Sequence, residues 1–134
     1  EGATERGLFG YLLANDWHDL SAQRICLVDV LGKYNFHRYM ALLEAYGIPH
    51  GVMLDDDNSK EHQGAVNDLV EASANGHTLA APVKFADCLE TFLGLPVPAK
   101  DKKPVEILKA VTGGKIGADR LQALRAEFCR ALAI

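Results

Sequence analysis

Hydrophobic and polar positions follow two different periods along the chain, and these periods predict the order of its elements. Apolar residues recur every three or four positions in several stretches, as in amphipathic helices. The helices predicted in this way cover residues 4–14, 36–46, 61–74, 85–93, 105–111 and 117–133. Short, nearly continuous apolar runs predict buried strands at 24–30, 52–54 and 78–81. Strand and helix alternate up to residue 81, which indicates a parallel sheet with right-handed crossovers.

Length and composition indicate one globular domain. The 134 residues are 49% hydrophobic, enough for a sizeable core. No apolar run approaches the ~20 residues of a membrane helix, so we expect no membrane partner. The cysteine pattern given below is typical of a cytoplasmic protein. The chain opens on Glu1 without a Met, which suggests a fragment of a longer protein. Three scattered cysteines flanked by apolar residues predict reduced, buried thiols at Cys26, Cys88 and Cys129.

Charge is divided unevenly along the chain. Residues 1–98 hold 6 Lys and Arg against 14 Asp and Glu, a net −8, and residues 99–134 hold 8 against 4, a net +4. The two parts sum to the overall −4. An acidic N-terminal part followed by a basic C-terminal part suits a metal centre beside a surface that binds phosphates. An ordinary acidic domain with a basic terminal helix gives the same distribution.

Three consecutive acids follow the predicted strand 52–54, and they are the first candidate for chemistry. Side chains alternate along a strand, so Asp55 and Asp57 are expected on one side and Asp56 on the other. Ligands of open α/β sheets bind at the carboxyl ends of the strands, and paired carboxylates suit Mg²⁺. A shift of one residue would put Asp56 in place of Asp55. A solvated acidic turn is the other interpretation of the same residues.

Two further acids flank a glycine at the start of the chain. Glu5 falls in the first helical turn, where the helix dipole alone favours an acid. Glu1 precedes that turn. If a strand ended at Glu1 beside residues 52–54, then Glu1, Glu5, Asp55 and Asp57 would converge at one sheet edge. Carboxylates gathered in this way need cations, and a pair of metal ions is the arrangement used for in-line phosphoryl chemistry.

Three segments together resemble the Toprim domain of the OLD (overcoming lysogenization defect) family of nucleases. They are residues 1–5 (EGATE), 28–35 (VDVLGKYN) and 47–57 (GIPHGVMLDDD). The resemblance implies an α/β Toprim fold, a Rossmann-like and mostly parallel sheet flanked by helices, with a helical C-terminal part. It implies metal-ligand roles for Glu1, Glu5, Asp55 and Asp57, with Glu1 and Asp55 also catalytic, and Mg²⁺ or Mn²⁺, two ions, as cofactor.

The same resemblance implies a metal-side role for Glu90 and a catalytic role for Lys115, which would stabilise charge on a phosphate. An exposed helix position and a helix flank are the ordinary interpretations of these two residues. The turn at Gly32 and Lys33 lacks the spacing of a Walker A motif, so no ATP site is expected within this chain. The resemblance also implies DNA as partner, an N-terminal ATPase domain in the same parent chain, and a homodimer of the full-length protein.

The function predicted for residues 1–134 is therefore metal-dependent DNA endonuclease activity by a two-metal mechanism. The strand that should precede Glu1 lies outside the sequence, and we expect it in the parent protein. Three alternatives stay open at this point. They are Toprim chemistry of the topoisomerase or primase type, a receiver-like phosphorylation module, and a non-catalytic DNA-binding module.

Overall fold

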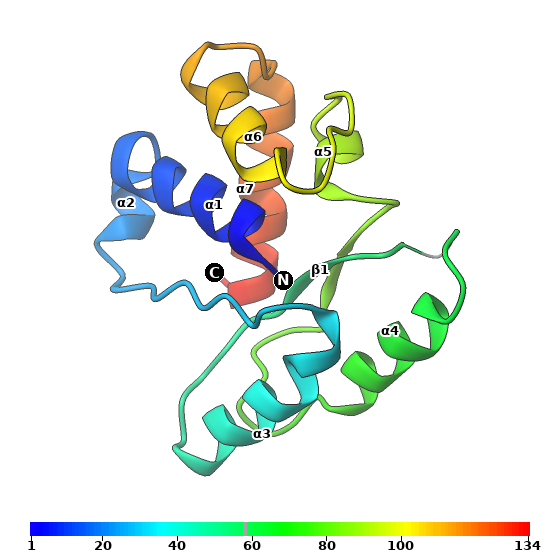
Figure 1. Ribbon diagram of the computed structural model, residues 1–134. Helices are drawn as coiled ribbons and strands as arrows, with labels where there is room; N and C mark the ends of the chain where they lie inside the picture. Colours follow the sequence, from blue (N-terminus) through cyan, green and yellow to red (C-terminus); the bar gives the residue numbers. More distant parts are fainter. Residues whose placement is uncertain (58) are drawn as a thin grey trace.

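Two short parallel strands lie between two groups of helices in the computed structural model, which describes residues 1–57 and 59–134 (Figure 1). Helices α1, α2, α6 and α7 lie on one side of the strands, and α3 and α4 on the other. The elements in chain order are α1 (Ala3–Asn15), α2 (His18–Ser21), the 3₁₀ turn η1 (Lys33–Asn35), α3 (Phe36–Ala45), β1 (Met53–Asp55), α4 (Gln63–Ala72), β2 (Val83–Phe85), α5 (Leu89–Phe92), α6 (Lys103–Thr112) and α7 (Ala118–Leu132).

The amphipathic helices are confirmed, with ends that differ by a few residues. Helix α1 begins at Ala3, one residue before the predicted start, and Gly2 is at its N-cap position. Asn35 precedes α3, and its side chain donates to the carbonyl oxygens of Val30 and Leu31 instead of capping the helix. The short helix α2 lies between the predicted helix 4–14 and the predicted strand 24–30.

Strands β1 and β2 pair in parallel, with Met53 opposite Val83 and Asp55 opposite Phe85. The strand predicted at 52–54 is confirmed within one residue. The strand predicted at 78–81 is wrong, because the ladder forms at 83–85, where Val83 and Phe85 are buried and the residue between them is exposed. Thr78 makes one isolated bridge with His50. The helix predicted at 85–93 is shorter than expected. Only residues 89–92 form helix α5, and residue 85 belongs to β2.

The strand predicted at 24–30 is wrong, because residues 25–30 belong to no helix or strand and run as a coil between α2 and η1 (Figure 1). No backbone–backbone hydrogen bond joins them to any other part of the described chain. A groove of about 640 Å³ separates them from residues 50–53, so the two segments cannot form a ladder. The predicted sheet of three or more strands is therefore reduced to one parallel pair among the described residues, and the coarser α/β expectation holds.

The sheet and its helices enclose two hydrophobic clusters. The larger one joins α1, β2, α6 and α7 and contains the ring contacts of Phe9 with Trp17 and Phe128. The smaller one, between the sheet and α3 and α4, includes Met40 and Leu54. The clusters lie on opposite faces of β1, because successive side chains of a strand point to opposite faces.

Two further expectations can be compared with the structure. No helix in the described chain is long and apolar enough to cross a membrane. All three cysteines are free thiols, and Cys88 is buried, but Cys26 is exposed on the unpaired segment and Cys129 is half-buried. The prediction of buried thiols is therefore wrong for Cys26.

Candidate metal centre

The carboxyl end of β1 meets the start of α1, and this contact brings together acids that are far apart in sequence. The amide of Asp55 donates to the Glu1 carboxylate (Oε2) at 3.0 Å. The Glu1 amino group lies 3.4 Å from the carbonyl oxygen of Met53, and the amide of Gly32 donates to the Glu1 carbonyl at 3.3 Å. Glu1 is thus held from both sides, with its carboxylate against the end of β1.

Glu5 and Asp55 complete this part of the site. The Gly2 amide donates to Glu5 Oε2 at 2.9 Å, so the first turn of α1 fixes the Glu5 carboxylate next to Glu1. Asp55 Oδ1 accepts a hydrogen bond of 2.8 Å from the Leu89 amide, at the start of α5. Three segments that begin near residues 1, 55 and 89 therefore meet at one point.

Burial and mutual repulsion disfavour the charged forms of Asp55 and Glu1. Asp55 is 7% exposed, and burial, followed by the charges of Glu5 and Glu1, raises its pKa from 3.8 to about 7. Burial also raises the pKa of Glu1, although the hydrogen bond from Asp55 and the charge of Lys33 oppose the shift. Among the described residues, no lysine or arginine forms an ion pair with Glu1 or Asp55, whereas Asp57 and Glu90 each have at least one.

Asp57 lies in a different electrostatic environment from Asp55. The buried ammonium of Lys33 lies 3.3 Å from Asp57 Oδ2, and Lys60 pairs with the other carboxylate oxygen. Burial favours the neutral form of Asp57, but the hydrogen bond from Lys60 and the charge of Lys33 outweigh it, so its pKa is lowered. Asp57 is thus an ion-paired carboxylate at neutral pH.

Asp56 points away from the other acids. Its Oδ1 accepts a 2.8 Å hydrogen bond from the Asn67 side chain on α4, and its backbone carbonyl accepts another at 2.7 Å. The structure therefore puts Asp55 on the side of Glu1 and Glu5, and Asp56 on the side of α4.

Glu90 lies next to the residue that bonds Asp55, and it is almost completely buried. Its exposed fraction is 2%, and Lys103 Nζ lies 3.2 Å from its Oε2. Its other oxygen, Oε1, is buried and has no hydrogen-bond partner in the described chain. A buried carboxylate oxygen without a donor is costly, and a bound cation would satisfy it.

The structure does not bring Lys115 into contact with these acids. Its backbone amide closes the C-terminal end of α6 on Ala110, its side chain is exposed, and its charge acts on Glu106. Lys103, which contacts Glu90, begins the same helix. Ten helical residues span about 15 Å, so Lys115 lies at the far end of α6 from the acids. The catalytic role expected for Lys115 stays a prediction.

Three lysines that the sequence did not identify as site residues supply the cations of the site: Lys33, Lys60 and Lys103. Lys33 follows Gly32, whose φ of 109° allows the tight turn before η1, and the Lys33 side chain is buried after this turn. The position of Lys33 within a segment of the family resemblance was the one available signal. Nothing in the local sequence marks Lys60 or Lys103.

The donor set consists of carboxylate oxygens, which suits a hard divalent cation. Within the described part of the chain, however, no three His, Cys, Asp or Glu side chains are arranged so that they could hold a metal ion together. The oxygens of Glu1, Glu5 and Asp55 described above accept backbone amides instead. The unpartnered oxygen of Glu90 and the uncompensated charge around Asp55 fit a cation chemically.

Comparison with known proteins supports the resemblance found in the sequence. The family model described as the overcoming lysogenization defect protein-like TOPRIM domain matches residues 1–57. No curated protein and no solved structure matches the chain. The matched stretch includes Glu1, Glu5, Asp55 and Asp57, and it ends before Glu90 and Lys115. The predicted resemblance to the OLD-type Toprim domain is thereby confirmed over residues 1–57.

Proposed function

We propose that this chain is the catalytic domain of a divalent-metal-dependent DNA endonuclease. The observation that carries the proposal is the convergence, at the carboxyl end of β1, of Asp55 with Glu1 and Glu5 from the start of the chain; Asp55 follows Glu1 by 54 residues. The match to a Toprim family model supports nucleic-acid chemistry that depends on metal ions. DNA as substrate, an ATPase domain in the parent chain and a homodimer of the full-length protein belong to the same proposal.

Glu1, Glu5 and Asp55, together with Glu90, would hold one ion, which would replace the backbone amides that Glu1, Glu5 and Asp55 now accept. The ion, Mg²⁺ or Mn²⁺, supplies an activated water and neutralises charge on the phosphate. A second ion, as the sequence analysis predicts, would involve Asp57. There it would compete with Lys60, whose exposed side chain can move away, and with Lys33, which is buried.

The lysines of the site have a defined task in this proposal. Lys33 keeps Asp57 ionised and fixes it to the loop that also bonds Glu1. Lys103 holds one oxygen of Glu90 and leaves the other for the ion. These cations reduce the repulsion among the carboxylates before a metal arrives.

Incubation of the protein with supercoiled plasmid in Mg²⁺, in Mn²⁺ and in EDTA tests the proposal. Nicked or linear DNA is expected with either metal and none with EDTA. Asp55→Ala should abolish cleavage, whereas Asp56→Ala, the matched control on the other face, should keep it at a measurable level. Plasmid that stays supercoiled in every metal, while the protein still binds DNA, would favour a non-catalytic DNA-binding module.

A further inference from the structure

The loop that carries Lys33 also exposes two large apolar side chains, which have no task in the proposed function. Leu31 is 76% exposed and Tyr34 is 60% exposed, and Leu31 is the most exposed large hydrophobic residue of the described chain. Apolar side chains scattered singly over a surface are ordinary. These two, however, lie on either side of a lysine that is buried against an acid of the candidate metal centre.

The loop connects these two side chains directly to the site. Between them in sequence, the Gly32 amide donates to the carbonyl oxygen of Glu1 at 3.3 Å, and Lys33 Nζ lies 3.3 Å from Asp57 Oδ2. Consecutive Cα atoms are about 3.8 Å apart, so both apolar side chains begin next to a residue that bonds an acid of the site. A DNA strand with a phosphate at the metal centre would therefore pass beside them.

Local hydrogen bonds hold this loop in an unfavourable backbone conformation. Leu31 has a φ of 59°, in the left-handed region that residues with a Cβ atom rarely adopt. Its amide donates to Asp29 Oδ1 at 2.8 Å, and the Asn35 side chain donates to the carbonyl oxygens of Val30 and Leu31 at 3.0 and 3.3 Å. Strained residues that are fixed from both sides are typical of functional sites. The loop thus keeps Leu31 in a defined position in solvent.

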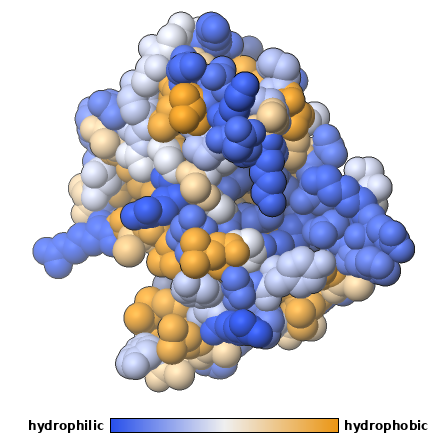
Figure 2. All heavy atoms as spheres, in the orientation of Figure 1, coloured by the Kyte–Doolittle hydropathy of each residue, from blue (hydrophilic) through white to orange (hydrophobic). Residues whose placement is uncertain are grey.

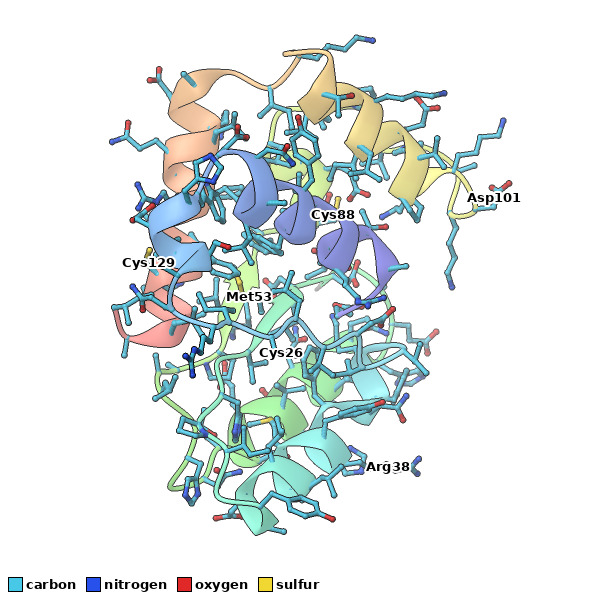
Figure 3. All side chains as sticks on the ribbon, turned by 90° about the vertical axis from the view of Figure 1, so that its left-hand side faces the viewer. Cys26, Arg38, Met53, Cys88, Asp101 and Cys129 are labelled. Carbon is cyan, nitrogen blue, oxygen red and sulfur yellow. The ribbon has the colours of Figure 1, made fainter. Side chains whose placement is uncertain are left out.

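Cations near the loop favour a partner that carries phosphates. Arg38 lies four residues after Tyr34, points outward from α3 in Figure 3, and forms no ion pair within the described chain. The exposed side chain of Lys60 lies at Asp57. Figure 2 shows apolar side chains in the middle of one face, with hydrophilic side chains around them. Apolar groups beside cations suit DNA, which offers both phosphates and the flat faces of bases.

The form of the DNA decides whether these apolar side chains find a contact. In a paired duplex the faces of the bases are covered by their neighbours in the stack. An unstacked base can stack on an aromatic ring, and an aliphatic side chain can fill an opened base step. Exposed leucine and tyrosine side chains beside a phosphate site therefore favour DNA that is unpaired or easily opened there.

We infer that Leu31 and Tyr34 bind unstacked bases next to the scissile phosphate, so that the chain prefers DNA with unpaired nucleotides at that position. Tyr34 stacks on one base, and Leu31 fills the opened step beside it. The choice of DNA as ligand rests on the proposed function. The inference concerns binding, however, and its test does not require cleavage.

Fluorescence anisotropy with a short labelled duplex that has a central bulge of unpaired nucleotides, and with the same duplex fully paired, tests the inference. Binding is measured in EDTA and in Ca²⁺, which takes oxygen ligands as Mg²⁺ does. The parent chain should bind the bulged duplex at least about fivefold more tightly than the paired one. Tyr34→Ser and Leu31→Asn should each reduce this preference to about twofold or less. Asparagine tolerates the left-handed conformation, so the loop keeps its shape.

Matched variants separate base contact from other effects of substitution. Tyr34→Phe keeps the aromatic ring and should keep the preference. Leu42→Ser, in the last turn of α3, and Leu69→Ser, on α4, remove exposed apolar side chains away from the loop and should change neither affinity. The salt dependence of binding should stay the same in Tyr34→Ser, because its phosphate contacts are kept. Thermal midpoints report whether each variant is folded, and Tyr34→Ser decides if Leu31→Asn is destabilised.

The outcomes distinguish this inference from the proposed function. Equal affinity of the parent for both duplexes, or a preference that persists in Tyr34→Ser, overturns the inference and leaves the nuclease proposal standing if plasmid is cleaved. A preference that depends on Leu31 and Tyr34 in a protein that cleaves no DNA supports the inference and refutes the nuclease activity. A parent chain that binds neither duplex in either condition overturns both.

Discussion

Asp55→Asn removes the most strongly shifted carboxyl group of the site, and its effect on stability follows from the structure. The pKa of Asp55 is raised from 3.8 to about 7 in the folded chain, so the folded state binds a proton that the unfolded state has released. Stability is therefore highest at low pH and is lost as pH rises through the folded pKa. Between pH 5 and pH 8 the loss amounts to about 2–3 kcal/mol.

An asparagine at this position has no proton to lose, and its side-chain oxygen can still accept from the Leu89 amide. The variant should therefore lose much less stability over the same range, with a remainder from Glu1, whose pKa is also raised. For 134 residues, a loss of this size corresponds to a shift of the thermal midpoint of about 7–11 °C.

Thermal unfolding in EDTA at pH 5 and pH 8, followed by circular dichroism, measures this difference. Asp68→Asn, which neutralises an exposed acid of α4, is the matched control and should lose as much stability as the parent chain. Adding Mg²⁺ at pH 8 should raise the midpoint of the parent and have a smaller effect on Asp55→Asn. If Asp55→Asn and the parent lose the same stability from pH 5 to pH 8, the electrostatic account of the site is refuted.

Three further substitutions test other parts of the structure. Lys33→Met leaves the buried carboxylate of Asp57 without its buried partner, so urea unfolding should show a loss of about 3 kcal/mol, and Lys33→Arg should recover part of it. Gly51→Ala should cost several kcal/mol, because a Cβ there would overlap the backbone of α7, whereas Gly76→Ala, with open space around it, should change stability little. Lys115→Ala should lower the single-turnover cleavage rate ~10²–10³-fold if the residue stabilises the transition state, and an unchanged rate on bound DNA would exclude that role.

The helices could be predicted from the sequence because each one depends mainly on its own apolar face. Thus α3, α4, α6 and α7 lie where the three-to-four-residue spacing places them. Strands depend on neighbours that are distant in sequence. Residues 25–30 have the composition of a strand, but no adjacent backbone pairs with them. The second strand was predicted at 78–81 because residues 79–81 are apolar. The ladder forms after Pro82 instead, where Val83 and Phe85 are buried in the core.

The acids of the candidate site could be predicted, because strand alternation and position at a strand end are local properties. Asp55 and Asp56 do point to opposite sides, as the alternation requires. The lysines that pair with these acids could not be predicted from the local sequence in the same way. Lys33 approaches Asp57 across 24 positions of sequence, and Lys103 approaches Glu90 through the packing of α6 near α5. Such ion pairs arise from the tertiary arrangement, which no local pattern encodes.

Some acids of the site form ion pairs with lysines and others do not, and this difference indicates where a metal ion would bind. Asp57 and one oxygen of Glu90 are already neutralised by lysines, and both stay balanced without a metal. Glu1 and Asp55 have no such partner at bonding distance in the described chain, and burial raises the pKa of each carboxyl group, so these two bind protons more readily than a free carboxylate does. A divalent ion displaces protons from carboxylates more readily than it displaces a buried lysine from an ion pair. The Glu1 and Asp55 side is therefore where a first ion should bind, and Lys33 should remain on Asp57 when it does.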